Sequence, residues 1–269
     1  MPKFNTGLCL LVSVVLSLSS VLRADDIEVK KDVPYVPTPE AVVEEMIKLA
    51  EVKEGDVVYD LGCGDGRIVI AAVKKGAKRG VGVDIDPQRI KESNENSKIA
   101  GVTEKVAFQV KDLFEMDFKD ASVLTLYLLP EVNRRLRPKI LDELKPGSRV
   151  VSHAFDMEDW KPDEEKTVEP GGENVYFWIV PAKVDGSWNA KLKSPRGETA
   201  VKLNLKQSYQ NVTGTATIDD KDQEIAEGKL KGDELTFILP SEPDVRYAAK
   251  VNGTKLEGAG TAAVSGVRQ

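Results

Sequence analysis

The chain has 269 residues, of which 41% are hydrophobic and 30% are charged, an ordinary composition for a folded globular protein. Its formal net charge is −6, which argues against a nucleic-acid partner held by charge. In the most basic run, residues 133–139, a solvated helix face is expected. The length suits one large domain, or a medium domain with a small companion.

The first two dozen residues differ in character from the rest. Lys3 precedes an uncharged apolar segment, residues 7–22, and Arg23 and Ala24 then lead into an acidic start. This order is typical of a secretory signal, and an uncleaved anchor is the alternative because the apolar run is just short of the ~18 residues that usually span a bilayer. Residues 1–24 are therefore predicted to be a signal peptide or N-terminal anchor. The protein is accordingly expected to be exported, to the periplasm or the extracellular space, or to be membrane-anchored and close to a membrane.

Cysteine usage is consistent with export. Cys9 lies in the predicted signal, which leaves Cys63 alone in the mature chain and allows no intramolecular disulfide. Cys63 stands between two glycines and far in sequence from His153, so a small filler residue is expected there rather than a catalytic thiol. No metal is predicted.

Predicted helices and strands alternate from residue 39 onward. Thr38 as N-cap and Pro39 as first helical residue predict a helix that runs to about Val52. Strands are expected at 57–61, 80–85, 106–110, 123–128 and 149–152, helices at 67–75, 87–100 and 131–144, and a closing antiparallel pair at 166–168 and 175–180. This alternation predicts an α/β fold with a parallel sheet covered on both faces.

The pattern changes beyond Pro181. Helical periodicity disappears, residues 200–206 alternate between apolar and polar, and hairpin turns are expected at 185–186, 231–233 and 252–253. We predict a small antiparallel β domain of about seven strands over residues 183–269, closed or half-closed as a barrel. It could hold a small apolar ligand, dock a substrate or attach to a surface, and a passive accessory role is the default.

A cluster of glycines follows the strand expected at 57–61. Gly62, Gly64 and Gly66 let the backbone turn tightly and approach a ligand. Their spacing is G-x-G-x-G, whereas the fingerprint of a dinucleotide site is G-x-G-x-x-G. Asp60 precedes the cluster and Asp65 lies inside it, and carboxylates there repel a pyrophosphate but suit a cofactor end that carries an ammonium and a sulfonium. The pattern favours S-adenosylmethionine over a nicotinamide dinucleotide.

Two further acids follow predicted strands. Asp84 ends the second strand, where a carboxylate can accept hydrogen bonds from both ribose hydroxyls. Asp112 follows the third strand and is positioned to meet the adenine amino group, with an Asx turn as the alternative. The run from Asp60 to Gly66, followed by Asp84 and Asp112, resembles motif I and the later acidic positions of class I, seven-strand methyltransferases.

A narrower resemblance rests on residues 34–38, 65–72 and 149–152. These are similar to the small protein-lysine methyltransferases that include mitochondrial enzymes acting on membrane carriers and on components of ATP synthase. The resemblance implies a Rossmann-like seven-strand sheet in a methyltransferase domain over residues 33–182, and N-methylation of a protein lysine with S-adenosylmethionine. The alternatives are a small-molecule methyltransferase and a non-catalytic exported binding protein on the same scaffold.

The sequence says less about the binding site for the methyl acceptor. The fourth strand ends without the polar residue, two prolines and aromatic residue usual in enzymes that methylate nucleobases or glutamine. Tyr35, Tyr127 and Leu128 could desolvate a lysine and favour its uncharged form, although a core strand also explains the last two. His153 is a candidate base or a structural residue. No catalytic residue is assigned, and the predicted cofactor-binding residues are Tyr35, Asp60, Gly62, Gly64, Asp65, Gly66, Asp84 and Asp112.

Overall fold

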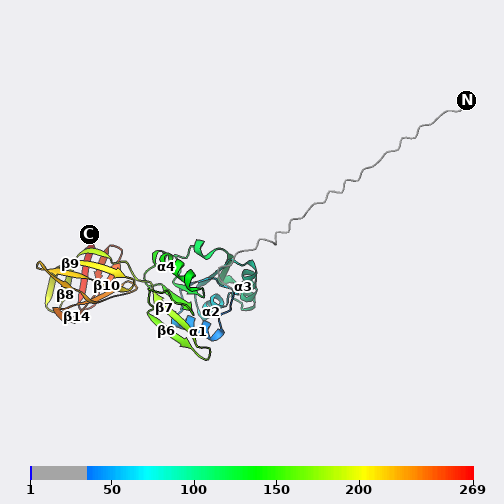
Figure 1. Ribbon diagram of the computed structural model, residues 1–269, viewed down its shortest axis with the longest axis horizontal. Coiled ribbons are helices and arrows are strands. Elements are labelled where there is room, and N and C mark those ends of the chain that lie inside the picture. Colours follow the sequence, from blue (N-terminus) through cyan, green and yellow to red (C-terminus); the bar gives the residue numbers. More distant parts are fainter. Residues whose placement is uncertain (2–34) are drawn as a thin grey trace. The chain divides into compact units, whose positions relative to one another are not determined.

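The computed structural model describes Met1 and residues 35–269. The predicted signal or anchor, residues 1–24, lies outside the described residues apart from Met1. The described chain contains a seven-stranded sheet followed by a nine-stranded sheet (Figure 1).

The first sheet is built from alternating strands and helices. Its strands are β1 (Val57–Leu61), β2 (Arg79–Asp84), β3 (Val106–Val110), β4 (Val123–Leu126), β5 (Arg149–His153), β6 (Glu164–Val168) and β7 (Glu173–Ile179). Its helices are α1 (Glu40–Leu49), α2 (Arg67–Lys75), α3 (Pro87–Ile99) and α4 (Pro130–Glu143), with the short 3-10 turns η1 (Thr103–Lys105) and η2 (Leu113–Glu115).

The strand order is β3-β2-β1-β4-β5-β7-β6. Strands β1 to β5 are parallel, whereas β7 runs antiparallel to β5 and β6 antiparallel to β7. The chain moves to one side of β1 with β2 and β3 and to the other side with β4 and β5. A ligand crevice forms at such a switch point, beyond the carboxyl ends of β1 and β4. The predicted Rossmann-like sheet is confirmed.

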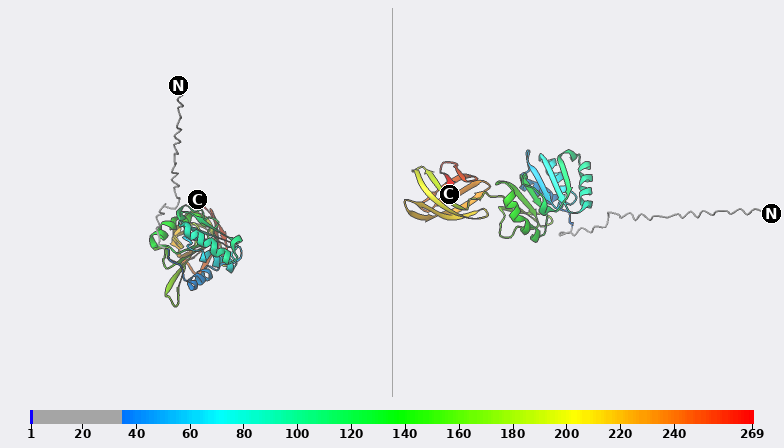
Figure 2. Two further views of the ribbon diagram at one scale, coloured as in Figure 1. Left: turned by 90° about the vertical axis from the view of Figure 1, so that its right-hand side faces the viewer. Right: turned by 90° about the horizontal axis from the view of Figure 1, so that it is seen from above.

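The sheet and its helices can be followed in Figure 2, and two clusters of buried hydrophobic side chains join them. On one face, Met46 of α1 and Ile68 of α2 pack with Val58. On the other, Leu136 and Ile140 of α4 pack with buried strand residues and with two tryptophans, Trp160 and Trp178. Prolines begin α3 and α4, each shortly after a strand ends. Proline suits the first turn of a helix, because the backbone N–H that it lacks would have no hydrogen-bond partner there.

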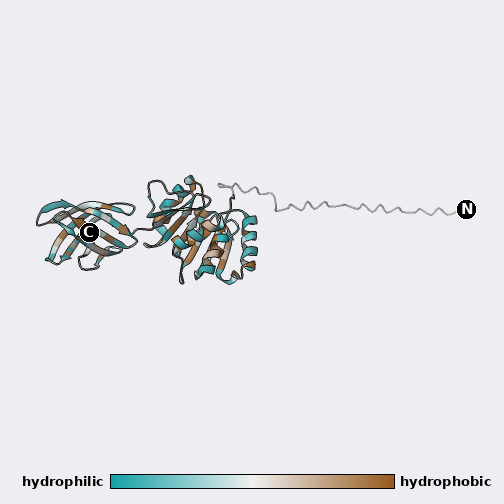
Figure 3. Ribbon diagram, turned by 90° about the horizontal axis from the view of Figure 1, so that it is seen from below, coloured by the Kyte–Doolittle hydropathy of each residue, from teal (hydrophilic) through white to brown (hydrophobic). Residues whose placement is uncertain are grey.

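The second sheet is antiparallel apart from a single parallel bridge between β14 and β16. Its strands are β8 (Gly186–Ser194), β9 (Gly197–Ser208), β10 (Asn211–Ile218), β11 (Lys221–Glu224), β12 (Ala226–Lys231), β13 (Glu234–Leu239), β14 (Glu242–Asn252), β15 (Lys255–Gly258) and β16 (Ala263–Arg268). Because β9 also pairs with β10, eight strands close into a barrel, and β11 pairs with β10 on the same side as β12. Polar and hydrophobic residues alternate along these strands (Figure 3), and side chains such as Trp188 and Phe237 fill the interior.

Several predicted boundaries differ from the observed ones. The barrel has more strands than the seven expected, because β11 and β15 contain four residues each and carry little hydrophobic periodicity. Strand β4 ends at Leu126 rather than Leu128, since the chain leaves the sheet there to begin α4 at Pro130. The closing pair β6 and β7 is present as predicted.

A buried ion pair ties the amino ends of the strands to the end of α1. Arg149 contacts Asp56 and donates to the carbonyl oxygens of Ala50 and Glu51, 2.6 and 3.0 Å away. The Asp56 side chain is 6% exposed and that of Arg149 13%. Burial raises the pKa of Asp56, but hydrogen bonds from Lys53, Ser122 and Arg149 outweigh it and leave the pKa below its ordinary value.

Replacement of Arg149 by methionine is expected to lower the unfolding free energy by about 3 kcal/mol, because the Asp56 charge stays buried without its partner. Lys191→Met is the matched control, since Lys191 pairs with Glu198 on the surface, with side chains 66% and 55% exposed. The control should cost less than about 1 kcal/mol. Urea unfolding of both variants tests this, and equal losses would contradict it.

Candidate functional site

A cavity that opens to solvent lies at the carboxyl ends of β1, β2 and β4. Of the predicted cofactor-binding residues, Tyr35, Asp60, Gly62, Gly64, Asp65, Asp84 and Asp112 line it. Gly66 does not. Most of the residues singled out from the sequence are therefore brought together at the switch point of the sheet.

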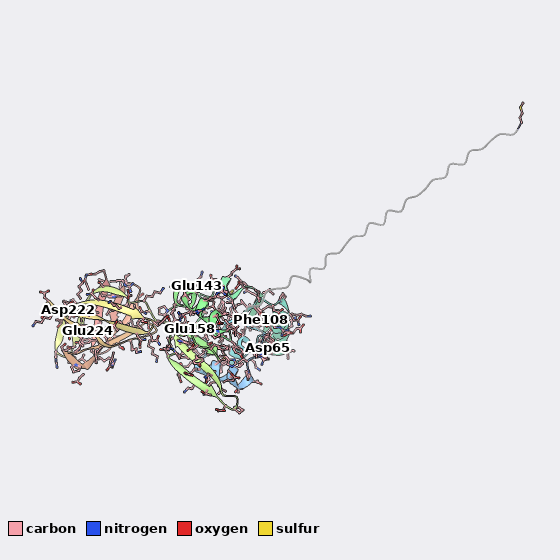
Figure 4. The ribbon with its side chains drawn as sticks, in the orientation of Figure 1. Asp65, Phe108, Glu143, Glu158, Asp222 and Glu224 are labelled. Atoms are coloured by element: carbon pink, nitrogen blue, oxygen red, sulfur yellow. The ribbon has the colours of Figure 1, made fainter. Side chains whose placement is uncertain are left out.

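The glycine loop has a left-handed backbone. Gly64 has φ +53°, and a β-carbon there would lie 2.5 Å from Cε2 of Tyr35. Gly66 has φ +80° and begins α2, and a β-carbon there would lie 2.8 Å from Cζ of Phe108 and 3.0 Å from Cβ of Ser93. Gly64 thus allows the backbone to approach the cavity, while Gly66 allows α2 to pack against its neighbours. Figure 4 marks Asp65 and Phe108 in this part of the chain.

Asp84 links the end of β2 to the glycine loop. Its Oδ2 accepts a hydrogen bond from the Gly64 N–H at 3.0 Å, and its Oδ1 accepts one from the Asp86 N–H at 2.9 Å. Burial raises the pKa of this carboxyl above its ordinary value, although the two backbone bonds oppose the rise. A carboxylate has about four acceptor positions, so two remain for hydroxyl groups of a ligand.

Asp60 is almost fully buried at the end of β1, 2% exposed. The Thr125 hydroxyl donates to its Oδ1 at 2.8 Å. Burial, together with the nearby Asp84 and Asp65 carboxylates, raises the pKa of Asp60 to about 7. Among the described residues these acids form no group with histidine or cysteine that could hold a metal ion. A cationic ligand group is the partner that would most stabilise ionised Asp60.

The charge of Asp65 is already paired. Arg67 Nη2 lies 2.6 Å from Asp65 Oδ2 and Arg67 Nε 2.9 Å from Oδ1, which is a two-pronged contact. Burial raises the pKa of Asp65, but the hydrogen bonds and charge of Arg67 outweigh it and keep the pKa below its ordinary value. Arg67 Nη1 also donates to the Thr38 carbonyl oxygen at 2.8 Å. Asp65 therefore orients Arg67, which holds the segment before α1.

That segment, Tyr35 to Thr38, forms one wall of the cavity. The Arg89 guanidinium lies 4.4 Å from the centre of the Tyr35 ring, in the arrangement of a cation–π contact. Tyr35 is 42% exposed and lies against Gly64. We refer to residues 35–38 as the strap.

Asp112 makes the Asx turn considered as the alternative for it. Its Oδ1 accepts a hydrogen bond from the Phe114 N–H at 2.8 Å at the start of η2. Both Asp112 and Phe114 line the cavity. The turn thus presents a carboxylate and an aromatic ring to the same space.

The part of the cavity where we expect the methyl acceptor is largely apolar. Tyr127, Leu128 and Val36 line the cavity, and Leu128 packs where a side chain on Gly62 would lie. His153 is fully buried and is not part of the lining. Burial holds the pKa of its imidazole below the ordinary value, against the opposing effect of Glu173. The geometry does not make His153 a base for a group in the cavity.

Sequence reasoning missed several lining residues. Thr38, Arg67, Arg89 and Phe114 all face the cavity. Thr38 and Arg67 belong to the stretches that carried the family resemblance, which was the available signal. Nothing in the local pattern distinguishes Arg89 from a solvated residue of α3.

The known proteins that this chain resembles are methyltransferases. The family model described as the ANTKMT methyltransferase domain matches residues 60–164. A protein-lysine N-methyltransferase from Saccharolobus islandicus is 48% identical over 151 residues, which are 55% of this chain and 94% of that protein. The chain belongs to the ANTKMT methyltransferase family. The strands β8 to β16 lie beyond the part that the family model matches.

Two further relatives extend the comparison. The adenine nucleotide translocase lysine N-methyltransferase of Mus musculus is 33% identical over 51% of this chain and 59% of that protein. A crystal structure titled as an RNA methyltransferase from Salinibacter ruber, in complex with S-adenosyl-L-homocysteine, has 52% sequence identity and a TM-score of 0.53, and covers 55% of this chain and 96% of that one. The predicted methyltransferase activity and cofactor, S-adenosylmethionine, are confirmed.

The predicted location is wrong. The relatives are named for acceptors such as adenine nucleotide translocase and a component of ATP synthase, and none of these names describes an exported or membrane-anchored enzyme. No helix in residues 35–269 is both long enough and apolar enough to cross a membrane. The apolar segment that suggested export lies outside the described residues. The prediction of export rested on the order of basic, apolar and small residues in that segment.

Asp60→Asn should stabilise the cofactor-free protein in a pH-dependent way. The pKa of Asp60 in the fold, about 7, exceeds its ordinary value of 3.8. The protonated carboxyl is therefore favourable below about pH 4, and its contribution is lost as the pH rises through about 7. We expect the variant and the wild type to unfold alike near pH 4 and the variant to be more stable, by about 4 kcal/mol, near pH 8. Urea unfolding at both pH values measures this, and a pH-independent difference would contradict it.

Proposed function

We propose that the cavity binds S-adenosylmethionine and that the enzyme N-methylates a lysine side chain of a protein. The observation that supports the proposal most is the buried, singly hydrogen-bonded Asp60 beside the glycine loop, a site for a cationic cofactor end. The amino-acid end of the cofactor would lie near Asp60, and its ribose hydroxyls would bond to the free acceptor positions of Asp84. Asp112 and Phe114 would hold the adenine, and Tyr35 would cover the loop.

We assign Asp65 a different part from that of Asp60. Its carboxylate is paired with Arg67, so we propose that it orients this arginine and the strap rather than the cofactor's ammonium. Gly66 supports the loop indirectly, by letting α2 approach Phe108 and Ser93. The remaining glycines, Gly62 and Gly64, provide the backbone surface against which the cofactor would lie.

Methyl transfer requires positioning and little covalent help from the protein. When bound, S-adenosylmethionine supplies a methyl group on a sulfonium centre. The lysine nitrogen must be uncharged to form the new N–C bond as the S–C bond breaks, and its proton leaves to solvent. Tyr127, Leu128 and Val36 would surround the lysine with apolar atoms, which disfavours the ammonium form. These residues would thus raise the fraction of reactive amine.

A protein acceptor is favoured over RNA. The relatives named as lysine methyltransferases support it, as do the apolar acceptor side and the net charge of −6, which gives a polyanion little attraction. The Salinibacter ruber structure is titled as an RNA methyltransferase, and RNA is for that reason the second candidate. The cavity suits a nucleobase less well than a lysine, because a base would need polar partners near Tyr127.

We propose that residues 33–182 form the methyltransferase domain and residues 183–269 an accessory domain. The change between the two sheets falls between β7, which ends at Ile179, and β8, which begins at Gly186. The barrel interior is filled by buried side chains, including Trp188, Phe237 and Tyr247. Because side chains fill this interior, we expect a partner of this domain to bind on the outside of the barrel.

Asp84→Ala should lower the affinity for S-adenosylmethionine at least about tenfold, since it removes charge-assisted hydrogen bonds to the ribose. Gly64→Arg should abolish binding, because Tyr35 already occupies the space of a side chain there. Asp117→Ala is the control, as Asp117 pairs with Lys119 on the surface. Calorimetric titration measures all three, and normal binding by either site variant would contradict the proposed site.

Tritium from labelled S-adenosylmethionine is expected to enter a protein when the wild-type enzyme is incubated with a cell lysate. The label should be lost from the precipitable fraction after protease treatment and retained after RNase treatment. Acid hydrolysis should then release it as methylated lysine. Label that is released by RNase would show RNA to be the acceptor, and Gly64→Arg provides the background.

A further inference from the structure

The only histidine of the chain lies behind the cavity and joins several of its walls. His153 ends β5, and its Nδ1 lies 3.2 Å from the hydroxyl oxygen of Thr38 in the strap. Its Nε2 lies 3.3 Å from Oε2 of Glu173 at the start of β7. Its ring centre lies 3.9 Å from that of Tyr127, which faces the cavity. One side chain thus touches the strap, the acceptor side and the β6–β7 hairpin.

The strap is fastened to the rest of the fold at Thr38. Arg67 bonds to its carbonyl oxygen and His153 is within hydrogen-bonding distance of its hydroxyl. Thr38 is itself buried, 3% exposed, whereas Tyr35 and Val36 are 42% and 54% exposed. The exposed end of the strap, which covers Gly64, therefore depends on a buried attachment three residues along the chain.

We propose that His153 is a positioning residue for methyl transfer: it holds the strap over the cofactor through Thr38 and supports the Tyr127 ring on the acceptor side. This inference rests on the proposed cofactor site. With Glu173 accepting from Nε2–H, the unprotonated Nδ1 accepts from the Thr38 hydroxyl. Loss of either partner removes one of the two attachments at Thr38 and leaves only the bond from Arg67. The bound state then has to restrict a segment that the wild-type protein already holds in place.

Thr38→Val and Thr38→Ser make a matched pair for the test. Valine keeps the shape of threonine but removes the hydroxyl, whereas serine keeps the hydroxyl. Calorimetry with S-adenosylmethionine should show about fivefold weaker binding for Thr38→Val, the loss expected for one neutral hydrogen bond. Thr38→Ser should remain within about twofold of the wild type.

A double-mutant cycle separates positioning from general stability. His153→Gln should weaken binding at least as much as Thr38→Val, and the double variant should bind no more weakly than His153→Gln, because both changes break one interaction. Binding is measured well below the melting temperature of each variant. Additive losses, or equal losses for Thr38→Val and Thr38→Ser, would overturn the proposal.

The single histidine also provides a spectroscopic signal without overlap. In ¹⁵N-labelled protein, the His153 ring nitrogens should show the Nε2–H tautomer, and the Nδ1 resonance should shift in Thr38→Val but not in Thr38→Ser. Addition of S-adenosylmethionine should shift the ring signals of the wild type. Signals that ignore both the Thr38 variants and the cofactor would overturn the inference, while absence of any cofactor binding by the wild type would contradict the proposed function as well.

Discussion

The site depends on the hydrogen bond between the Gly64 N–H and the carboxylate of Asp84. This bond joins the left-handed glycine loop after β1 to the end of the neighbouring parallel strand β2. It holds the loop against the end of that strand, and both residues line the cavity. Asp84 can serve a ligand only because its two backbone bonds leave acceptor positions unused.

The acidic residues around this bond have different roles, because their hydrogen-bond partners differ. Asp65 is satisfied by Arg67 and acts on the strap, whereas Asp60 is buried with one hydroxyl donor and has a raised pKa. The charge of Asp60 is therefore unfavourable unless a cation lies beside it. This unfavourable charge near neutral pH would contribute to affinity for a cofactor that carries an ammonium.

The sequence predicted the succession of strands and helices along the chain and most of the residues that line the cavity, because strand periodicity and the glycine spacing are local signals. It did not predict the partner of Asp65, the attachment of Thr38 to His153, or which two strands, β9 and β10, close the barrel. Each of these joins residues whose proximity arises from tertiary packing, which no local pattern contains. The predicted export failed for a different reason, since it rested on the order of residues in one short segment, 1–24, and on nothing in the rest of the chain.

A crystal structure of this chain with S-adenosyl-L-homocysteine would show whether Asp84 and Asp60 hold the cofactor. We expect both ribose hydroxyls on the carboxylate of Asp84, the ammonium group near Asp60 and the adenine beside Asp112. We also expect the bond from Gly64 to Asp84 to persist with the ligand bound. A cofactor bound elsewhere, or an Asp84 that contacts backbone alone in the complex, would contradict it.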